Sequence, residues 1–245
     1  MKTRIEKDSL GEINIPFESY YGVQTQRAVH NFPVSGWKAH PVMVDAYVYI
    51  KKAAAITNSE LGLLNKKIAG AIVKAADEVL DGKHRDHFVV DVYQAGAGTS
   101  HNMNTNEVLA NRGIEILGGK RGDYSVINPN DHVNMAQSTN DTFPTAMRLA
   151  SLIMVKRLLP VISKFRKTLE KKSREFSKVI KSGRTHLQDA APITLGQEFE
   201  GYAEIVSRHY DLISVTQKHL AELGIGGTAV GTGLNTHANY RPLMA

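Results

Sequence analysis

Residues 132–146 read HVNMAQSTNDTFPTA and join a run of small hydrogen-bonding side chains to a long apolar stripe. The stripe has helical spacing and consists of Leu149, Ile153, Ile162, Phe165, Leu169 and Phe176. Pro144 is suited to the first turn of a helix, so we expect a long helix to start near it. Pro160 is expected to kink this helix or to start a second segment.

A second stripe of helical spacing follows later in the chain. It consists of Leu195, Phe199, Tyr202, Val206, Ile213 and Leu220. The stripe predicts a helix of roughly 25–30 residues, or about 40 Å at ~1.5 Å per residue. Residues 182–190, SGRTHLQDA, connect the two stripes and are expected to form a turn. Helices of this length usually belong to a bundle that extends across subunits.

The part of the chain before these stripes has shorter runs of periodic apolar residues. The first forty residues are rich in glycine and proline between short alternating runs, which predicts an arm of loops with a small hairpin. Apolar residues at helical spacing, Ile68 to Val79, predict a helix that stops at Gly82. Another helix is expected to follow Ser100 and to end near residues 118–119.

Composition restricts the class of protein. The chain has 245 residues, 42% of them hydrophobic, and a formal net charge of +6, which suits an anionic partner. It has no cysteine, which excludes disulfides and thiolate chemistry. No apolar stretch is long enough for a signal peptide or a membrane span, so we expect a cytoplasmic protein with no membrane partner. The basic stretch 156–181 lacks interleaved aromatic residues, so we interpret it as a solvated face and expect no nucleic-acid partner.

Three polar clusters stand out: residues 96–107 (GAGTSHNMNTNE), 138–141 (STND) and 182–190. Such side chains ahead of a helix are more often caps than ligand sites, by roughly four to one for a single cluster. Three clusters with more hydroxyls and amides than caps need, one of them with a histidine, instead favour a pocket for a small anion. Neutral donors and helix ends would suit a substrate with two carboxylates.

Two other signals carry little weight. Residues 224–229, GIGGTA, fit a loose dinucleotide fingerprint, but they follow a predicted helix and lack the strand that this motif requires. His84 and His87 have a spacing found in metal sites, but cationic residues flank them and no third ligand is evident. We therefore expect no metal and no cofactor.

Four stretches together carry a family resemblance: GAGTSHNMNTNEVLANR, PNDHVNMAQSTNDTFPTA, GRTHLQDAAPITLGQEF and GGTAVGTGLNT. In this order they resemble the aspartase/fumarase superfamily over nearly the whole chain. The resemblance implies a mainly α fold, with a small N-terminal α/loop lyase domain (1–137) and the first part of a long central helical bundle (138–245). It also implies a homotetramer whose active sites are each built from three subunits.

The family reaction is a reversible anti elimination from a dicarboxylate. By resemblance, Thr99, Ser138 and Thr139 hold the carboxylate that gains charge, and Thr185 holds the other one. Asn140 and His186 lie near the leaving amine, and His186 is the catalytic candidate. The implied substrate pair is L-aspartate and fumarate, with ammonia as the leaving group.

Two alternatives remain open at the sequence level. Fumarate hydratases share the clusters but typically read VNKSQSSND, whereas this chain has Met135 and Thr139, which favours elimination of ammonia. A crystallin-like, non-catalytic helical assembly protein is the second alternative, and the intact Thr99, Ser138, Asn140 and His186 argue against it.

Family members continue well beyond the length of this sequence. The part without a counterpart here holds a mobile loop with the serine taken as the carbon base, followed by a GKVN segment that binds substrate. We therefore expect the chain to be truncated on its C-terminal side, without the rest of the bundle and the C-terminal domain, and inactive by itself.

Overall fold

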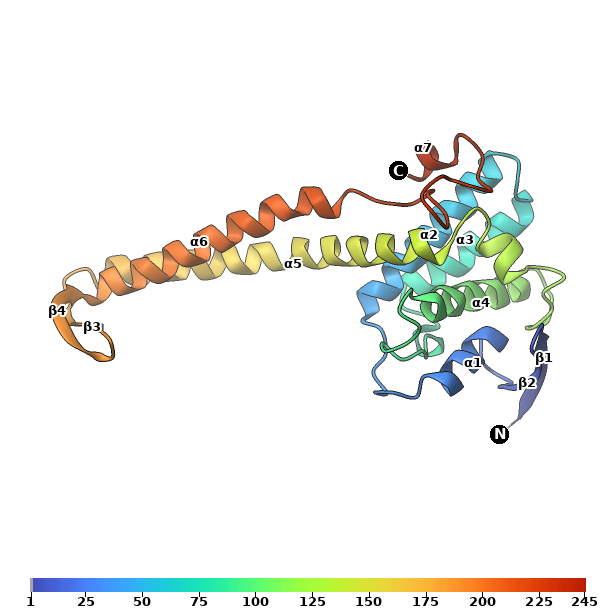
Figure 1. The fold of residues 1–245 in the computed structure, drawn as a ribbon, viewed down its shortest axis with the longest axis horizontal. Coiled ribbons are helices and arrows are strands. Elements are labelled where there is room, and N and C mark those ends of the chain that lie inside the picture. Colours follow the sequence, from blue (N-terminus) through green and yellow to red (C-terminus); the bar gives the residue numbers. More distant parts are fainter. Residues whose placement is uncertain (1) are drawn as a thin grey trace. The chain divides into compact units, whose positions relative to one another are not determined.

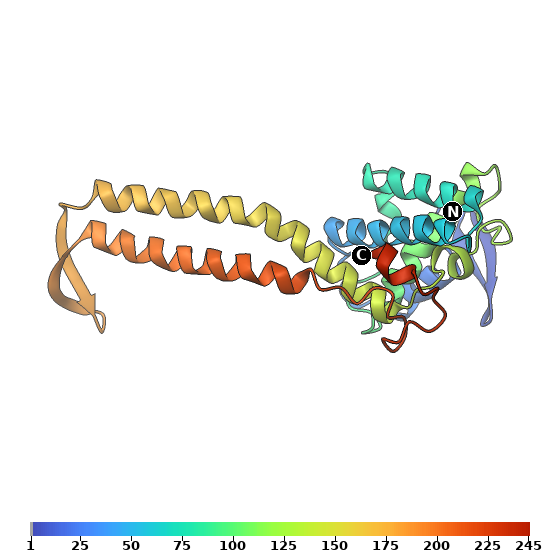
Figure 2. The same cartoon turned by 90° about the horizontal axis from the view of Figure 1, so that it is seen from above.

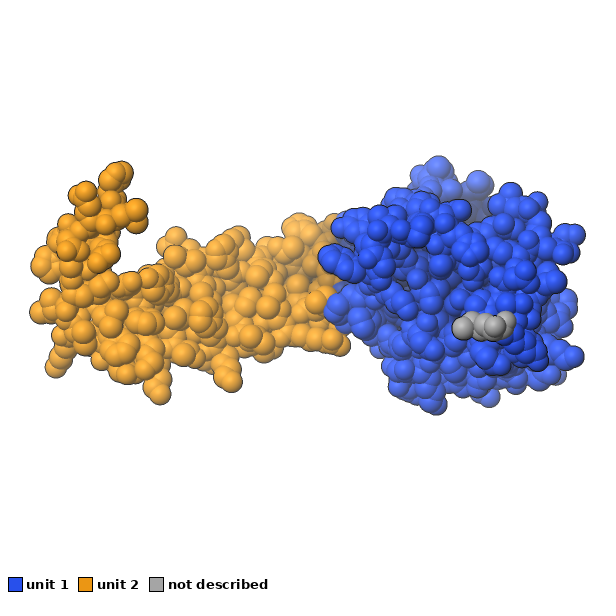
Figure 3. Space-filling view, turned by 90° about the horizontal axis from the view of Figure 1, so that it is seen from below, with its two compact units in different colours: residues 1–150, 223–245 blue, residues 151–222 orange. Residues whose placement is uncertain are grey.

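The computed structural model describes residues 2–245, which divide into two compact units (Figure 3). Unit 1 contains the residues up to 150 together with Leu223–Ala245, and unit 2 is Ser151–Glu222. The predicted division into domains 1–137 and 138–245 concerns the longer family enzyme and stays a prediction.

Unit 1 is mainly helical, with one β-hairpin near its start (Figure 1). Its elements in chain order are β1 (Thr3–Asp8), β2 (Gly11–Pro16), α1 (Val23–Asn31), α2 (Pro41–Glu60), α3 (Lys66–Leu80), the short turn η1 (Arg85–His87), α4 (Thr99–Ile116), the π-helical turn η2 (Pro129–Val133), the first part of α5 (Thr139–Glu175) and α7 (Tyr240–Met244). The hairpin, α3 and α4 confirm the elements expected from the sequence. Gly82 and Gly118 follow α3 and α4 with φ of +93° and +85°, values that favour glycine and end both helices.

The core of unit 1 lies between α2, α3 and α4. Val48, Ile72, Val108 and Ile114 are fully buried there, one or two from each helix. Asn65 caps α3, since its Oδ1 accepts a hydrogen bond from the Lys67 N–H at 2.8 Å. The three helices therefore form a frame on which the loops before α4 and α5 are held.

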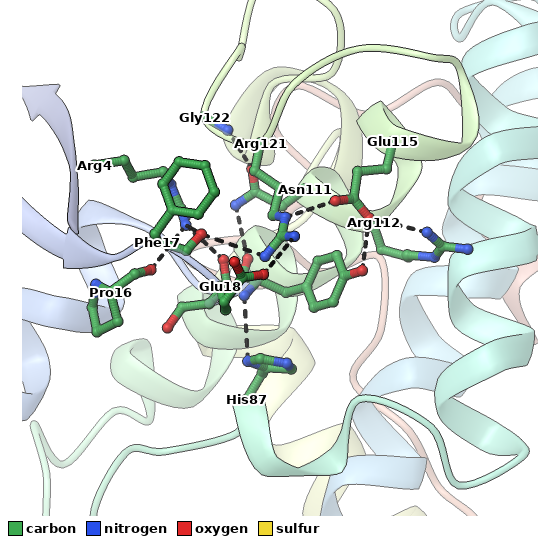
Figure 4. A network of polar contacts seen from close by, with 12 residues as sticks. Arg4, Pro16, Phe17, Glu18, His87, Asn111, Arg112, Glu115, Arg121 and Gly122 are labelled. Atoms are coloured by element: carbon green, nitrogen blue, oxygen red, sulfur yellow. Dashed lines mark hydrogen bonds and ion pairs between the residues drawn. The ribbon is translucent and has the colours of Figure 1, made fainter. Parts of the chain in front are cut away.

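The N-terminal hairpin is fastened to this frame. The Arg4 guanidinium donates to the carbonyl oxygens of Pro16, Phe17, Ser19 and Tyr21 at 2.7–3.1 Å (Figure 4). Asn111 on α4 donates to Tyr20 O at 2.8 Å, and Tyr124 after α4 donates to Glu6 Oε2 on β1 at 2.9 Å. The predicted arm is thus bonded to the frame and does not project freely.

Tyr20 connects the segment after this hairpin to η1 and α4 through His87 and Glu115, which are labelled in Figure 4. Its hydroxyl donates to Glu115 Oε2 at 2.6 Å and its backbone N–H donates to His87 Nδ1 at 3.3 Å. The Arg121 guanidinium lies 4.8 Å from the Tyr20 ring centroid and binds Glu115. Burial is the largest influence on His87 and lowers the pKa of its ring, in keeping with an imidazole that accepts this hydrogen bond. The histidines set aside as metal ligands are therefore part of a structural network.

Unit 2 contains the rest of α5, the strands β3 (Ile180–Thr185) and β4 (Gln188–Thr194), and α6 (Leu195–Leu220). Its part of α5 and α6 run side by side (Figure 2), and Gly196 allows a close approach because an added Cβ would lie 2.5 Å from Ser173 O. Both predicted long helices are confirmed, and α5 continues through Pro160 as one helix, so the predicted second segment is wrong.

The polar connection between the long helices is a β-hairpin, which the sequence pattern did not reveal. His186 and Leu187 form its two-residue turn with φ of 51° and 61°. Positive φ at both central residues matches a type I′ turn, in which Asn-Gly is the usual pair. Among residues 2–245, no helix is both long and apolar enough to cross a membrane.

The Glu107 carboxylate caps α1 and provides a test of this arrangement. It is buried and accepts hydrogen bonds from the backbone N–H groups of Gly22, Gln24 and Thr25 at 2.8–3.0 Å. Glu107→Ala should lower the free energy of unfolding by about 3 kcal/mol or more, because it leaves buried donors unpaired. Glu107→Gln keeps an acceptor oxygen and should lose less. Urea unfolding of this chain, followed by circular dichroism, gives both values, and equal losses would contradict the capping role.

Candidate functional site

A cavity of about 570 Å³ lies in unit 1 beside the start of α5. Its lining comes from α4, from η2 and the segment after it, from the first residue of α5 and from the loop before α7. The lining residues are Asn102, Met103, Asn130, Asp131, Asn134, Met135, Ala136, Gln137, Ser138, Thr139, Thr228, Ala229, Leu234 and Asn235. The pocket is therefore built from segments that lie far apart in the sequence.

Ser138 and Asp141 cap the start of α5. Ser138 Oγ accepts the Asn140 N–H at 3.2 Å, and Asp141 Oδ1 accepts the Ser138 N–H at 2.9 Å. The pair resembles a capping box, but an aspartate replaces the usual glutamate and the serine hydroxyl binds the N–H two residues later, not three. The helix starts at Thr139, so Pro144 lies in its second turn and the predicted place of Pro144 in the first turn is wrong.

The second oxygen of Asp141 binds a distant loop. Asp141 Oδ2 accepts the N–H groups of Gly226 at 3.1 Å and Thr228 at 2.9 Å. The Asn140 side-chain amide adds a bond by donating to Ala229 O at 2.8 Å. Residues 224–229, set aside above as a dinucleotide fingerprint, thus form a wall of the pocket.

Lys51 lies behind the same pocket and was not among the residues predicted from the sequence. Its side chain on α2 is fully buried, and Nζ donates to Asn102 Oδ1, Asn134 Oδ1 and Gln137 Oε1 at 2.7–2.9 Å. These three amides line the pocket. Burial lowers the pKa of Lys51 to about 7, and the Asp141 charge acts in the opposite direction. A signal was present, because Lys51 shares a helical face with the apolar Tyr47, Ala54 and Ala55, where a lysine is unexpected.

Ser138 and Thr139 are the only predicted site residues among those that line this cavity. Thr99 opens α4 and lines a neighbouring hollow of about 200 Å³, and Met103 borders both hollows. The starts of α4 and α5 are in close contact, since a Cβ on Gly98 would lie 2.1 Å from the Phe143 ring. Asn140 is exposed and its amide nitrogen is engaged by Ala229.

Thr185 and His186 belong to unit 2. Thr185 ends β3 and His186 opens the hairpin turn, and both side chains are exposed. Their roles toward a substrate stay predictions. Within residues 2–245, no group of three histidine, aspartate or glutamate side chains is arranged to hold a metal ion.

The chemistry of the pocket is that of an anion site made mainly from neutral groups. Two hydroxyls lie at a helix N-terminus, where unpaired N–H groups and the helix dipole favour negative charge. A buried ammonium lies behind the amides and adds a positive charge when protonated. Such a site can bind a carboxylate and can stabilise charge that develops on it.

Comparisons with known proteins identify the family of the chain. Residues 11–245 match the family described as Lyase. An aspartate ammonia-lyase of Bacillus sp is 53% identical over 97% of this chain and 51% of its own length. A class II fumarate hydratase of Nitrosomonas europaea is 50% identical over 99% of this chain and 53% of its own length.

The solved structures show the same fold. A fumarate lyase:delta crystallin from Brucella melitensis, crystallised with cobalt, has a TM-score of 0.96 and 48% identity over 99% of this chain and 53% of that chain. A class II fumarase from Schistosoma mansoni has a TM-score of 0.94 and 42% identity over 99% of this chain and 51% of that chain. These matches confirm the expected mainly α fold with long bundle helices. The chain spans about half the length of the curated relatives it matches, and it belongs to the lyase family that includes the aspartases and class II fumarases.

Proposed function

We propose that this chain supplies the substrate-binding half of a carbon–nitrogen lyase that reversibly eliminates ammonia from L-aspartate to give fumarate. The observation that carries the proposal is the pairing of Ser138 and Thr139, at the start of α5, in a cavity of about 570 Å³. The aspartate ammonia-lyases among the relatives, at 52–53% identity, support the choice of substrate.

The reaction sets a clear electrostatic demand. A base removes a proton from the carbon next to one carboxylate, the electron pair delocalises into that carboxylate, and the amine leaves from the neighbouring carbon. The intermediate then carries extra charge on an anionic group, so donors fixed before the reaction lower the barrier. Ser138, Thr139 and the α5 N-terminus are proposed to supply these donors, together with Thr99.

The remaining predicted residues complete the proposed site. Thr185 would hold the second carboxylate, and Asn140 and His186 would lie beside the leaving amine. The carbon base is proposed to be a serine in the part of the relatives that this chain does not span. No cofactor takes part in this scheme.

We also propose a cytoplasmic homotetramer with active sites shared between subunits. Large apolar side chains on the long helices of unit 2 support association, because they are more than half exposed to solvent in the single chain. They include Val161, Phe165, Ile205, Leu212 and Val215.

Hydration of fumarate is the second candidate function, since class II fumarate hydratases match at 49–52% identity. It would use the same elimination with hydroxide as the leaving group. Met135 lines the pocket, at the position where fumarase sequences typically carry a lysine, and Thr139 replaces a serine. These two positions favour ammonia.

The substrate is tested directly in the full-length lyase proposed to contain this chain. It should form fumarate from L-aspartate, seen as ultraviolet absorbance, and leave malate essentially untouched. A purified wild-type fumarase serves as the positive control for malate. Malate turnover equal to or above that of aspartate would assign the chain to the hydratases.

Lys51 predicts a pH dependence of dicarboxylate binding. Below about pH 7 its ammonium is charged and attracts an anion, and above its pKa that charge is lost. The Kd of succinate for the full-length protein should therefore be lower at pH 6 than at pH 8. Lys51→Met should bind more weakly and lose this part of the pH dependence. Isothermal titration calorimetry measures the Kd of both proteins at pH 6 and pH 8. If the variant keeps the wild-type ratio of its Kd values at these two pH values, the role of Lys51 in binding is contradicted.

Shared sites predict complementation between inactive chains. Full-length Ser138→Ala and His186→Ala proteins, unfolded, mixed in equal amounts and refolded, should regain activity at about one quarter of the sites if the two residues come from different subunits. Each variant refolded alone is the control. Tetramers that form without recovered activity would contradict a shared site.

A further inference from the structure

Three residues that line the pocket adopt a strained backbone conformation. Ala136, Thr228 and Asn235 have φ of 61°, 55° and 65°, in the left-handed region that favours glycine. Among the described residues with positive φ, Thr228 is the one with a β-branched side chain, for which this conformation is a genuine outlier. Strain of this kind costs on the order of 1–3 kcal/mol and clusters at binding sites.

Neighbouring contacts hold Thr228 in this conformation. Its N–H is bound to Asp141 Oδ2 at 2.9 Å, and Gly226 and Ala229 on either side are bound to Asp141 and Asn140. These bonds also use the backbone donors of Gly226 and Thr228. The hydroxyl of Thr228 is not used by any of these bonds.

That hydroxyl has no partner among the described residues, although Thr228 is only 7% exposed. A buried hydroxyl without a partner costs about 1–3 kcal/mol. Thr228 lines the same cavity as Ser138 and Thr139, so a ligand in the cavity is placed to satisfy it.

We propose that the Thr228 hydroxyl is a further substrate-binding group. It donates a hydrogen bond to the same substrate carboxylate that Ser138 and Thr139 bind. This inference rests on the proposed function, because that function identifies the anion in the pocket as a dicarboxylate. A hydroxyl that donates to a carboxylate forms a charge-assisted bond, which is stronger than one between neutral groups.

Substitutions at Thr228 in the full-length protein test the role. Thr228→Val keeps the shape and removes the hydroxyl, so the Kd of succinate should rise about 10- to 100-fold. Thr228→Ser keeps the hydroxyl and should stay within about 3-fold of wild type. Thr232→Val, an exposed position in the same segment, is the matched control and should bind as wild type.

Thr228→Gly separates binding from folding, because glycine adopts this φ without strain. It should melt at or above the wild-type temperature and still lose as much succinate affinity as Thr228→Val. Wild-type affinity in either the Val or the Gly variant would overturn the inference, as would equal losses in the Val and Ser variants. A wild-type protein that binds neither succinate nor fumarate would instead refute the proposed function.

Discussion

The buried carboxylate of Asp141 is the interaction on which the pocket depends. One oxygen caps α5 through the Ser138 N–H, and the other holds the N–H groups of Gly226 and Thr228. A single side chain therefore sets where the helix begins and where the opposite wall lies. Its negative charge is compensated by three backbone donors, so the charge is used for structure and the pocket itself remains suited to an anion.

Neutral and charged groups have different positions around the pocket. Most polar groups that line the cavity are neutral hydroxyls and amides, with Asp131 as the acidic exception, and the buried Asp141 and Lys51 lie behind them and fix their orientation. Lys51 Nζ donates to the side-chain oxygens of three amides. This fixes the orientation of each amide and leaves its nitrogen for other partners. A site of this kind is preorganised, since its donors need little rearrangement when charge develops on a ligand.

Local patterns predicted the parts of the molecule that depend on local chemistry. Helical spacing and terminal glycines were sufficient for α3, α4, α6 and most of α5, and the crowding of small polar residues pointed to Ser138 and Thr139. The missed features depend on partners distant in sequence: Lys51 bonds with residues on α4 and after η2, and Thr228 with α5. The hairpin at His186 was missed because its turn lacks the glycine that normally indicates one.

Unit 1 is discontinuous in sequence, since unit 2 is inserted between its two stretches. On a ribosome, Asp141 is therefore made well before its partners Gly226 and Thr228, which follow 85 and 87 residues later. At about 5–20 residues per second this delay is on the order of ten seconds. The α2–α4 core has time to form during that interval, whereas the pocket wall does not yet exist. Ligand binding at this pocket is thus acquired only after residue 228 has been made, whatever the folding speed of the core.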